Sequence, residues 1–127
     1  MKFMEPMTNH NLINELISLV ENKEEYIKIR KEGVRWYFLK DIEGSLEEFK
    51  KMVDEKYPDY KGKLIPLMHN QEDLICIYQG KYIWIHLTSP GWEKRGEYFT
   101  AKEVWDNRIK KDIDEYYDGT YYPTKSH

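Results

Sequence analysis

The chain has 127 residues, of which 40% are hydrophobic, 34% charged and 15% aromatic, and its formal net charge is −3. These values exclude an intrinsically disordered chain and suit one domain over residues 1–127, with loosely ordered ends at 1–8 and 120–127. The small acidic excess also argues against a nucleic-acid binder, which needs lysine and arginine gathered on one face.

The cysteine content and the hydropathy bear on the cellular compartment. A single cysteine, Cys76, excludes an intrachain disulfide, and its apolar neighbours at 74–78 predict a buried thiol. Residues 1–7 lack the apolar stretch of a signal peptide, and no run is long enough to span a membrane. We therefore expect a cytoplasmic protein that makes no membrane contact.

The chain begins with a helical pattern. Aliphatic residues recur at helical spacing over residues 11–22, and Thr8, Asn9 or Asn11 can cap the amphipathic helix that this spacing predicts.

The next stretch is ambiguous at first and then turns to strand. Residues 26–30 fit either a strand or the end of a second helix closed by Gly33, and the helix is favoured. Residues 34–39 are rich in β-branched and aromatic side chains and predict a strand.

A helix is predicted next, because Ser45 and Glu48 have the spacing of a capping box. Apolar residues then follow one helical face until Pro58 ends it.

Three short strands at 64–68, 74–78 and 82–87 predict an antiparallel meander with tight turns. Pro66 cannot donate a hydrogen bond to a neighbouring strand, so we expect it at a sheet edge or a bulge.

The last strand of the meander has two different faces. Ile83, Ile85 and Leu87 alternate with an aromatic set made of Tyr82, Trp84 and His86. The aliphatic face is expected to cover the core, while the aromatic face is either covered by a helix or exposed.

A loop is predicted at 88–96, followed by a second capping box at Thr100 and Glu103, with Phe99 and Val104 as its hydrophobic staple. The helix that starts there is expected to end near Gly119. The order of the elements predicts an α+β domain.

The sequence contains no motif of a known catalytic site. Its four histidines have no metal-ligand spacing, and nucleophile elbows and phosphate-binding glycine loops are absent. His86 is better explained as a packed or surface side chain than as a catalytic base. We therefore expect no catalytic residues, no metal and no cofactor.

Two features suggest recognition of another protein. The acidic end of the last predicted helix, from Asp112 to Asp118, opposes the helix dipole and would suit a basic partner. The plainer interpretation, an ordinary solvated helix end, is favoured because such charges are screened. Trp92, in the predicted loop, is either an interface anchor or a lid on the sheet.

In the middle of the chain, an aromatic strand is predicted at 36–39, a short helix at 46–51 and an Ile-Pro-aliphatic strand at 64–67, followed by a polar turn and an Asp-aliphatic strand at 73–77. This order resembles that of the SUKH superfamily, which includes yeast Smi/Knr-type cell-wall regulators and many bacterial immunity proteins, and the resemblance covers roughly residues 25–105. Residues 25–33 match the helix and glycine turn that precede the aromatic strand. The sequence departs from the family pattern at Glu72, where a glycine is usual, and in the single Gly33 of the turn.

The resemblance implies a curved antiparallel sheet of about four to five strands packed by three to four helices, without catalytic residues. It also implies a role in binding and neutralising a toxin domain.

The sequence thus predicts a non-catalytic, immunity-type protein that binds a protein partner, with its oligomeric state left open. The alternatives are an oligomerising accessory protein of a phage or mobile element, and a small-ligand protein or enzyme with a site near His86. The predicted partner-binding residues combine exposure with suitable chemistry: Trp84, His86, Trp92, Glu93, Asp112, Asp114, Glu115 and Asp118.

Overall fold

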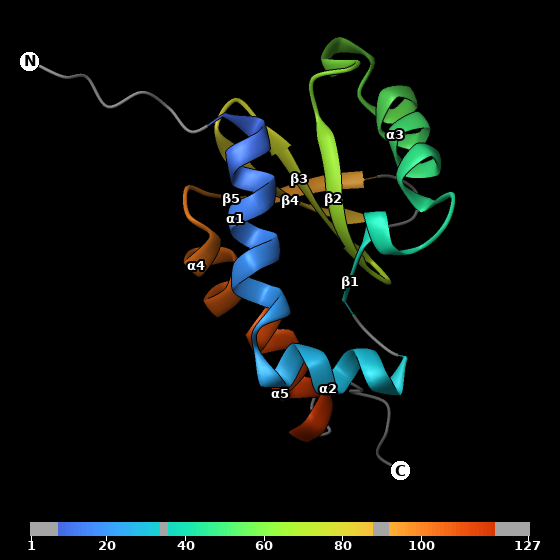
Figure 1. Ribbon diagram of the computed structural model, residues 1–127. Coiled ribbons are helices and arrows are strands. Elements are labelled where there is room, and N and C mark those ends of the chain that lie inside the picture. The colour runs from blue at the N-terminus through green and yellow to red at the C-terminus, as the bar shows by residue number, and fades with distance from the viewer. Residues whose placement is uncertain (1–7, 34–35, 88–91, 119–127) are drawn as a thin grey trace, which may run out of the picture.

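A computed structural model describes residues 8–33, 36–87 and 92–118 and confirms the α+β fold class. In this part of the chain, five strands form one open antiparallel sheet in the order β1-β2-β3-β4-β5 (Figure 1). The strands are β1 (Tyr37–Phe38), β2 (Ile65–Asn70), β3 (Asp73–Tyr78), β4 (Lys81–Leu87) and β5 (Trp92–Tyr98).

Within the described residues, four helical segments cover the sheet. The first three are α1 (Asn9–Glu21), α2 (Glu24–Glu32) and α3 (Ser45–Lys56). The fourth, which we name the C-terminal helix, runs without a break through α4 (Ala101–Val104), the π-helical turn η3 (Trp105–Ile109) and α5 (Lys110–Asp118). Two short 3-10 turns, η1 (Leu39–Asp41) and η2 (Pro58–Tyr60), flank α3.

Helices pack on both faces of the sheet, with α1 and α4 on one side and α3 on the other (Figure 1). We name the two sides the α1 face and the α3 face. Side chains on the α1 face form the larger core with α1, α2 and the C-terminal helix, and they include Met68, Ile75, Ile77 and Tyr82. Those on the α3 face form the smaller core with α3 and η1, and they include Leu74, Cys76, Ile83 and Ile85.

The ambiguous segment before Gly33 is helical, as favoured. Gly33 ends α2 in the left-handed conformation with φ 75°, and its N–H donates to the carbonyls of Ile29 and Arg30. Thr8 caps α1 by accepting a hydrogen bond from the Asn11 N–H at 3.0 Å. Apart from Thr8, the ends predicted to be loosely ordered lie outside the described residues.

The predicted strand at 34–39 is reduced to Tyr37–Phe38, because the chain turns into η1 at Leu39 and buries that side chain in the smaller core. Residues 34–35 lie outside the described part of the chain.

The capping box at Ser45 is a wrong prediction. Gly44, with φ 83°, is the N-cap of α3, and Ser45 is already its first helical residue. The Ser45 N–H donates to the Ile42 carbonyl at 3.0 Å, so a tight glycine turn starts the helix one residue earlier than predicted.

The meander forms as predicted, and Pro66 lies at its irregularity. The register between β2 and β3 shifts between Pro66 and Met68, so Leu67 and Met68 both reach the larger core. Pro66 also lies beyond β1, which pairs only with Met68 and His69.

Both faces of β4 are covered: the aliphatic face covers a core as expected, and the aromatic face is packed by helices, which is one of the two alternatives left open. Tyr82 is fully buried, and its hydroxyl donates to the Leu12 carbonyl at 2.7 Å. Ile83 and Ile85 cover the smaller core on the opposite face. Both faces carry apolar residues, so alternation alone does not show which one is more deeply buried.

The predicted loop at 88–96 is wrong from Trp92 onward, where β5 pairs with β4 along its length. The capping box at Thr100 is confirmed: its hydroxyl accepts from the Glu103 N–H at 3.1 Å, and Glu103 accepts from the Thr100 N–H at 3.0 Å. Phe99 is 65% exposed, which is incompatible with the predicted staple.

Candidate functional site

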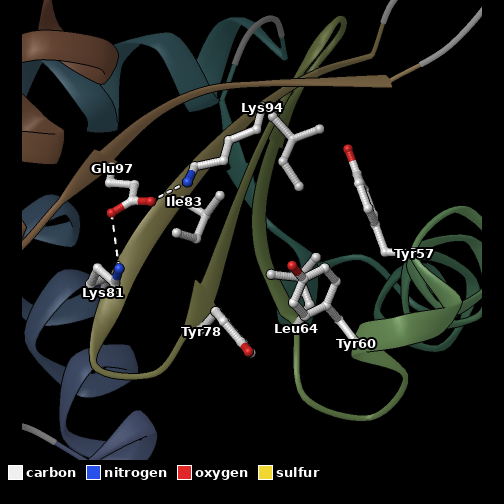
Figure 2. A pocket seen from close by; sticks show the side chains of 9 residues that line it. Tyr57, Tyr60, Leu64, Tyr78, Lys81, Ile83, Lys94 and Glu97 are labelled. Atoms are coloured by element: carbon white, nitrogen blue, oxygen red, sulfur yellow. Dashed lines mark hydrogen bonds and ion pairs between the residues drawn. The ribbon is translucent and has the colours of Figure 1, made fainter.

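A half-open groove lies on the α3 face, between strands β3, β4 and β5 and the segment formed by the end of α3 and η2 (Figure 2). Its volume is about 210 Å³. We name it the tyrosine groove, because three tyrosines surround an aliphatic floor, and it is lined by Tyr57, Tyr60, Leu64, Tyr78, Lys81, Ile83, Ile85, Lys94 and Glu97.

Local sequence places the three tyrosines. Tyr57 is the C-cap residue of α3, and Pro58 starts η2, which turns Tyr60 back toward the sheet. The Tyr60 ring centre lies 6.4 Å from that of Tyr57 and 5.1 Å from that of Tyr78 on β3. These edge contacts hold the rings around the groove without filling it.

Charged side chains form the rim on the sheet side. Glu97 on β5 accepts a hydrogen bond from Lys81 at 3.0 Å and another from Lys94. These bonds, first from Lys94 and then from Lys81, lower the pKa of Glu97, so its carboxylate is ionised at neutral pH. Burial raises the pKa of Tyr57, so its phenol is neutral there.

A second polar cluster, the Asp73 cluster, lies on the opposite, α1 face of the sheet. Asp73 Oδ1 accepts from Trp84 Nε1 at 2.8 Å and from His86 Nδ1 at 3.0 Å. Asp73 Oδ2 accepts from Arg108 at 3.4 Å, and the Arg108 guanidinium stacks over the Trp84 ring. Three elements, β3, β4 and η3, are joined at this carboxylate.

Three irregularities adapt the backbone to the Asp73 cluster. Arg108 lies in the π-helical turn, and the β4–β5 register shifts between Trp84 and Ile85. Gly96, opposite Trp84, leaves room for the indole: a Cβ there would come 3.3 Å from Trp84 Cε3. Such irregularities occur frequently at functional sites.

The chemistry available to the Asp73 cluster is limited, because its polar groups bond to one another. Asp73 uses both oxygens internally, and Trp84 and His86 each donate to it. Within the described ranges, no group of three or more histidine, cysteine, aspartate or glutamate side chains could hold a metal ion. We interpret the cluster as a clamp between the sheet and the C-terminal helix.

The predicted site residues on the sheet fall on both of its faces. Trp84 and His86 come together in the Asp73 cluster, while Glu93 is exposed on β5 and pairs with Arg95 at 3.4 Å. Trp92 is partly buried against the smaller core, with its ring 6.2 Å from that of Tyr57. It therefore packs on the sheet beside the tyrosine groove, which is the lid alternative.

The predicted acidic helix end does not form one exposed surface, and Asp112 does not belong to the exposed part. Asp112 is buried and accepts hydrogen bonds from Trp36 Nε1 at 3.0 Å and from Asn70. Asp114 pairs with Lys110 at 2.6 Å, one helical turn away. Glu115 is half-buried, and Asp118 is exposed at the end of α5. A helical period places Asp112 inward, toward Trp36.

The tyrosine groove was missed in the sequence, although a signal for it exists. Eleven tyrosines in 127 residues are unusual, and the Tyr57-Pro58-Asp59-Tyr60 segment marks a helix end followed by a turn. The convergence with Tyr78 depends on the fold.

Comparison with protein-family models, with curated proteins and with solved structures finds no match to this chain. Among the described helices, none combines the length and the apolar character that crossing a bilayer requires. The fold and the groove define an α+β domain in which helices flank an open antiparallel meander and a half-open groove lies between the sheet and the end of α3.

Proposed function

We propose that this chain is a non-catalytic protein-binding module that holds its partner in the tyrosine groove. The observation that carries the proposal is the set of three tyrosines around an aliphatic floor in a half-open groove on the α3 face of the sheet. Tyrosine and tryptophan are enriched among the residues that dominate binding energy at protein interfaces, because they bury a large area at a small entropic cost.

The size of the groove favours a protein partner over a small molecule. Pockets for small ligands usually measure about 300–1,000 Å³ and enclose most of the ligand. The groove is half-open and measures about 210 Å³, which suits one or two side chains inserted from a larger surface.

The groove offers little for catalysis. Its charged groups, Lys81, Lys94 and Glu97, are ion-paired to one another, and the remaining side chains are tyrosine, leucine and isoleucine. This composition supports binding rather than proton transfer or nucleophilic attack.

The resemblance to the SUKH superfamily suggests the biological role. We propose an immunity-type protein that neutralises a toxin domain in the cytoplasm, with no nucleic acid or membrane involved. Covering the toxin with a rigid domain requires only an interface, which is consistent with a groove set on the sheet.

The test is co-expression of the chain with the C-terminal domain of the protein whose gene lies immediately upstream. We expect that domain to arrest growth alone, and we expect the chain to restore growth and to co-purify with it. The double variant Tyr60→Ala/Tyr78→Ala should weaken the complex by about tenfold or more, as loss of aromatic hot-spot residues does. A harmless neighbour without complex formation would count against toxin neutralisation by this pair.

The matched control is Tyr117→Ala. Tyr60 and Tyr117 are 41% and 40% exposed, but Tyr117 lies on α5, away from the groove, where its hydroxyl donates to Glu32 at 2.8 Å. Its removal should leave both growth and the complex unchanged. Equal loss in the two variants would point to general destabilisation, and no loss in either would place the partner on another surface.

A further inference from the structure

The rim of the tyrosine groove carries a surplus positive charge. Two ammonium groups, of Lys81 and Lys94, share the single carboxylate of Glu97, with one oxygen bonded to each lysine. One positive charge is therefore uncompensated within this triad, beside an apolar floor, in a chain whose formal net charge is −3. A local positive charge attracts an acidic partner even where the net charge of the whole chain is negative.

The triad remains accessible to a partner. Lys94 has 51% of its side chain exposed, and Lys81 and Glu97 are about one-third exposed, at 28% and 31%. Figure 2 shows the triad along one wall, with Ile83 beside it and Tyr57 and Tyr60 along the facing wall. Ion pairs at such exposure contribute little net stability, so an incoming carboxylate can replace Glu97 at small cost.

Resting on the proposed function, we propose that the groove recognises an acidic segment of its protein partner. An aromatic or aliphatic side chain of that segment lies between the rings of Tyr57 and Tyr60 and the wall that contains Ile83, and a neighbouring carboxylate pairs with Lys81 and Lys94. The floor supplies the apolar contact and the lysines supply charge-assisted hydrogen bonds, so the two halves of the groove recognise two chemically different groups.

The first experiment uses a model peptide with no reference to the natural partner. A short acetylated and amidated peptide with a phenylalanine flanked by glutamates is titrated into the ¹⁵N-labelled full chain, beside the same peptide carrying glutamines. We expect the acidic peptide to shift the amide signals of Lys81, Ile83, Lys94 and Glu97 and to bind about fivefold or more tightly than the glutamine peptide. Equal binding, absence of binding, or shifts confined to other surfaces would overturn the proposal.

Variants of the triad give effects of opposite sign. Glu97→Gln removes the internal competitor for both lysines, so binding of the acidic peptide should strengthen about threefold to tenfold. The double variant Lys81→Gln/Lys94→Gln should weaken it by about tenfold or more. A triad that serves only to hold β4 and β5 together predicts instead that Glu97→Gln weakens binding or leaves it unchanged, and either result would overturn the proposal.

The matched control is Glu93→Gln, an exposed glutamate on the same strand that pairs with Arg95 and is opposite His86 in the β4–β5 register. It removes the same charge from the chain but not from the groove, so peptide affinity should stay unchanged. Signal dispersion in the same spectra verifies that each variant is folded.

The natural complex separates the two proposals. If the chain and the upstream-encoded domain associate equally well with and without the two lysines, the acidic-segment proposal fails while protein binding stands. If the complex survives Tyr60→Ala/Tyr78→Ala, the groove is not the partner site and both fail. If the complex requires the tyrosines and the lysines, both are supported.

Discussion

The guanidinium carbon of Arg108 lies 3.6 Å from the centre of the Trp84 ring, and the same guanidinium hydrogen-bonds to Asp73. The π-helical turn brings Arg108 to this position, and its Nε is buried without a hydrogen-bond partner among the described residues. A buried cation so placed depends on the carboxylate and the aromatic face that it contacts. This relationship ties the C-terminal helix to the sheet.

Removing that carboxylate should therefore be costly. Asp73→Ala leaves Arg108 without its counter-charge and Trp84 Nε1 and His86 Nδ1 without an acceptor. We expect the free energy of unfolding to fall by about 3 kcal/mol, measured by urea denaturation. Glu72→Ala is the control, because that neighbouring carboxylate is mostly exposed and its contact with His86 is long, at 3.9 Å. Its effect should stay within about 0.5 kcal/mol, and equal effects of the two would contradict the clamp.

Gly96→Ala tests the packing of the Trp84 indole. The added Cβ would lie 3.3 Å from Trp84 Cε3, and the ring is held by Asp73 and Arg108, so it cannot move aside freely. We expect a loss of about 1 kcal/mol in the free energy of unfolding and a shift of the Trp84 indole N–H signal.

The same substitution in a Trp84→Ala background should be neutral or stabilising, because the clash disappears and alanine restricts the unfolded chain more than glycine does. A similar loss in both backgrounds would mean that the backbone at Gly96, and not the indole, is responsible.

The two aspartates Asp112 and Asp114 on α5 should differ sharply. Asp112→Ala removes the acceptor of the buried Trp36 indole N–H and one hydrogen bond of the Asn70 amide, so we expect a loss of about 2–3 kcal/mol in the free energy of unfolding. Asp114→Ala removes an exposed pair with Lys110 and should change stability by less than about 0.5 kcal/mol. Chemical denaturation of both variants under one set of conditions decides the point. A neutral Asp112→Ala would restore the acidic helix end as a surface feature.

His69 should make stability depend on pH below neutrality. Burial lowers the pKa of His69 below its ordinary value of 6.5. The neutral ring fits its contacts, since Nδ1 accepts from the Tyr37 hydroxyl at 2.9 Å and Nε2 donates to the Gln71 carbonyl at 2.8 Å. Because the unfolded chain binds the proton more readily, this contribution is complete above pH 6.5 and is lost as the pH falls through the folded pKa.

Urea denaturation between about pH 7.5 and pH 5.5 measures this dependence, near the ordinary histidine pKa. His69→Gln should flatten the curve, whereas His10→Gln, which alters an exposed side chain on α1, should leave the slope as it is. If stability instead rose on acidification in a way that depends on His69, the predicted direction of the pH dependence would be wrong.

The sequence by itself determined the types of most elements. The helical period, the strand alternation and the Thr100 capping box are encoded over a few residues, so α1, α2, the three-stranded meander and the start of α4 agree with their predictions. The fifth strand was not predicted, because the charged residues of Trp92–Tyr98 are as typical of a solvent-exposed edge strand as they are of a loop.

Only the tertiary structure decided which faces and which polar side chains are buried. Asp112 meets Trp36 across 76 positions of sequence, and Tyr60 meets Tyr78 because α3 and the sheet pack together. Alternation shows that a strand has two faces, and a row of acidic residues shows that a segment is charged. Neither pattern identifies the side chains that pack against these residues, because burial is a property of pairs of surfaces brought together by the fold.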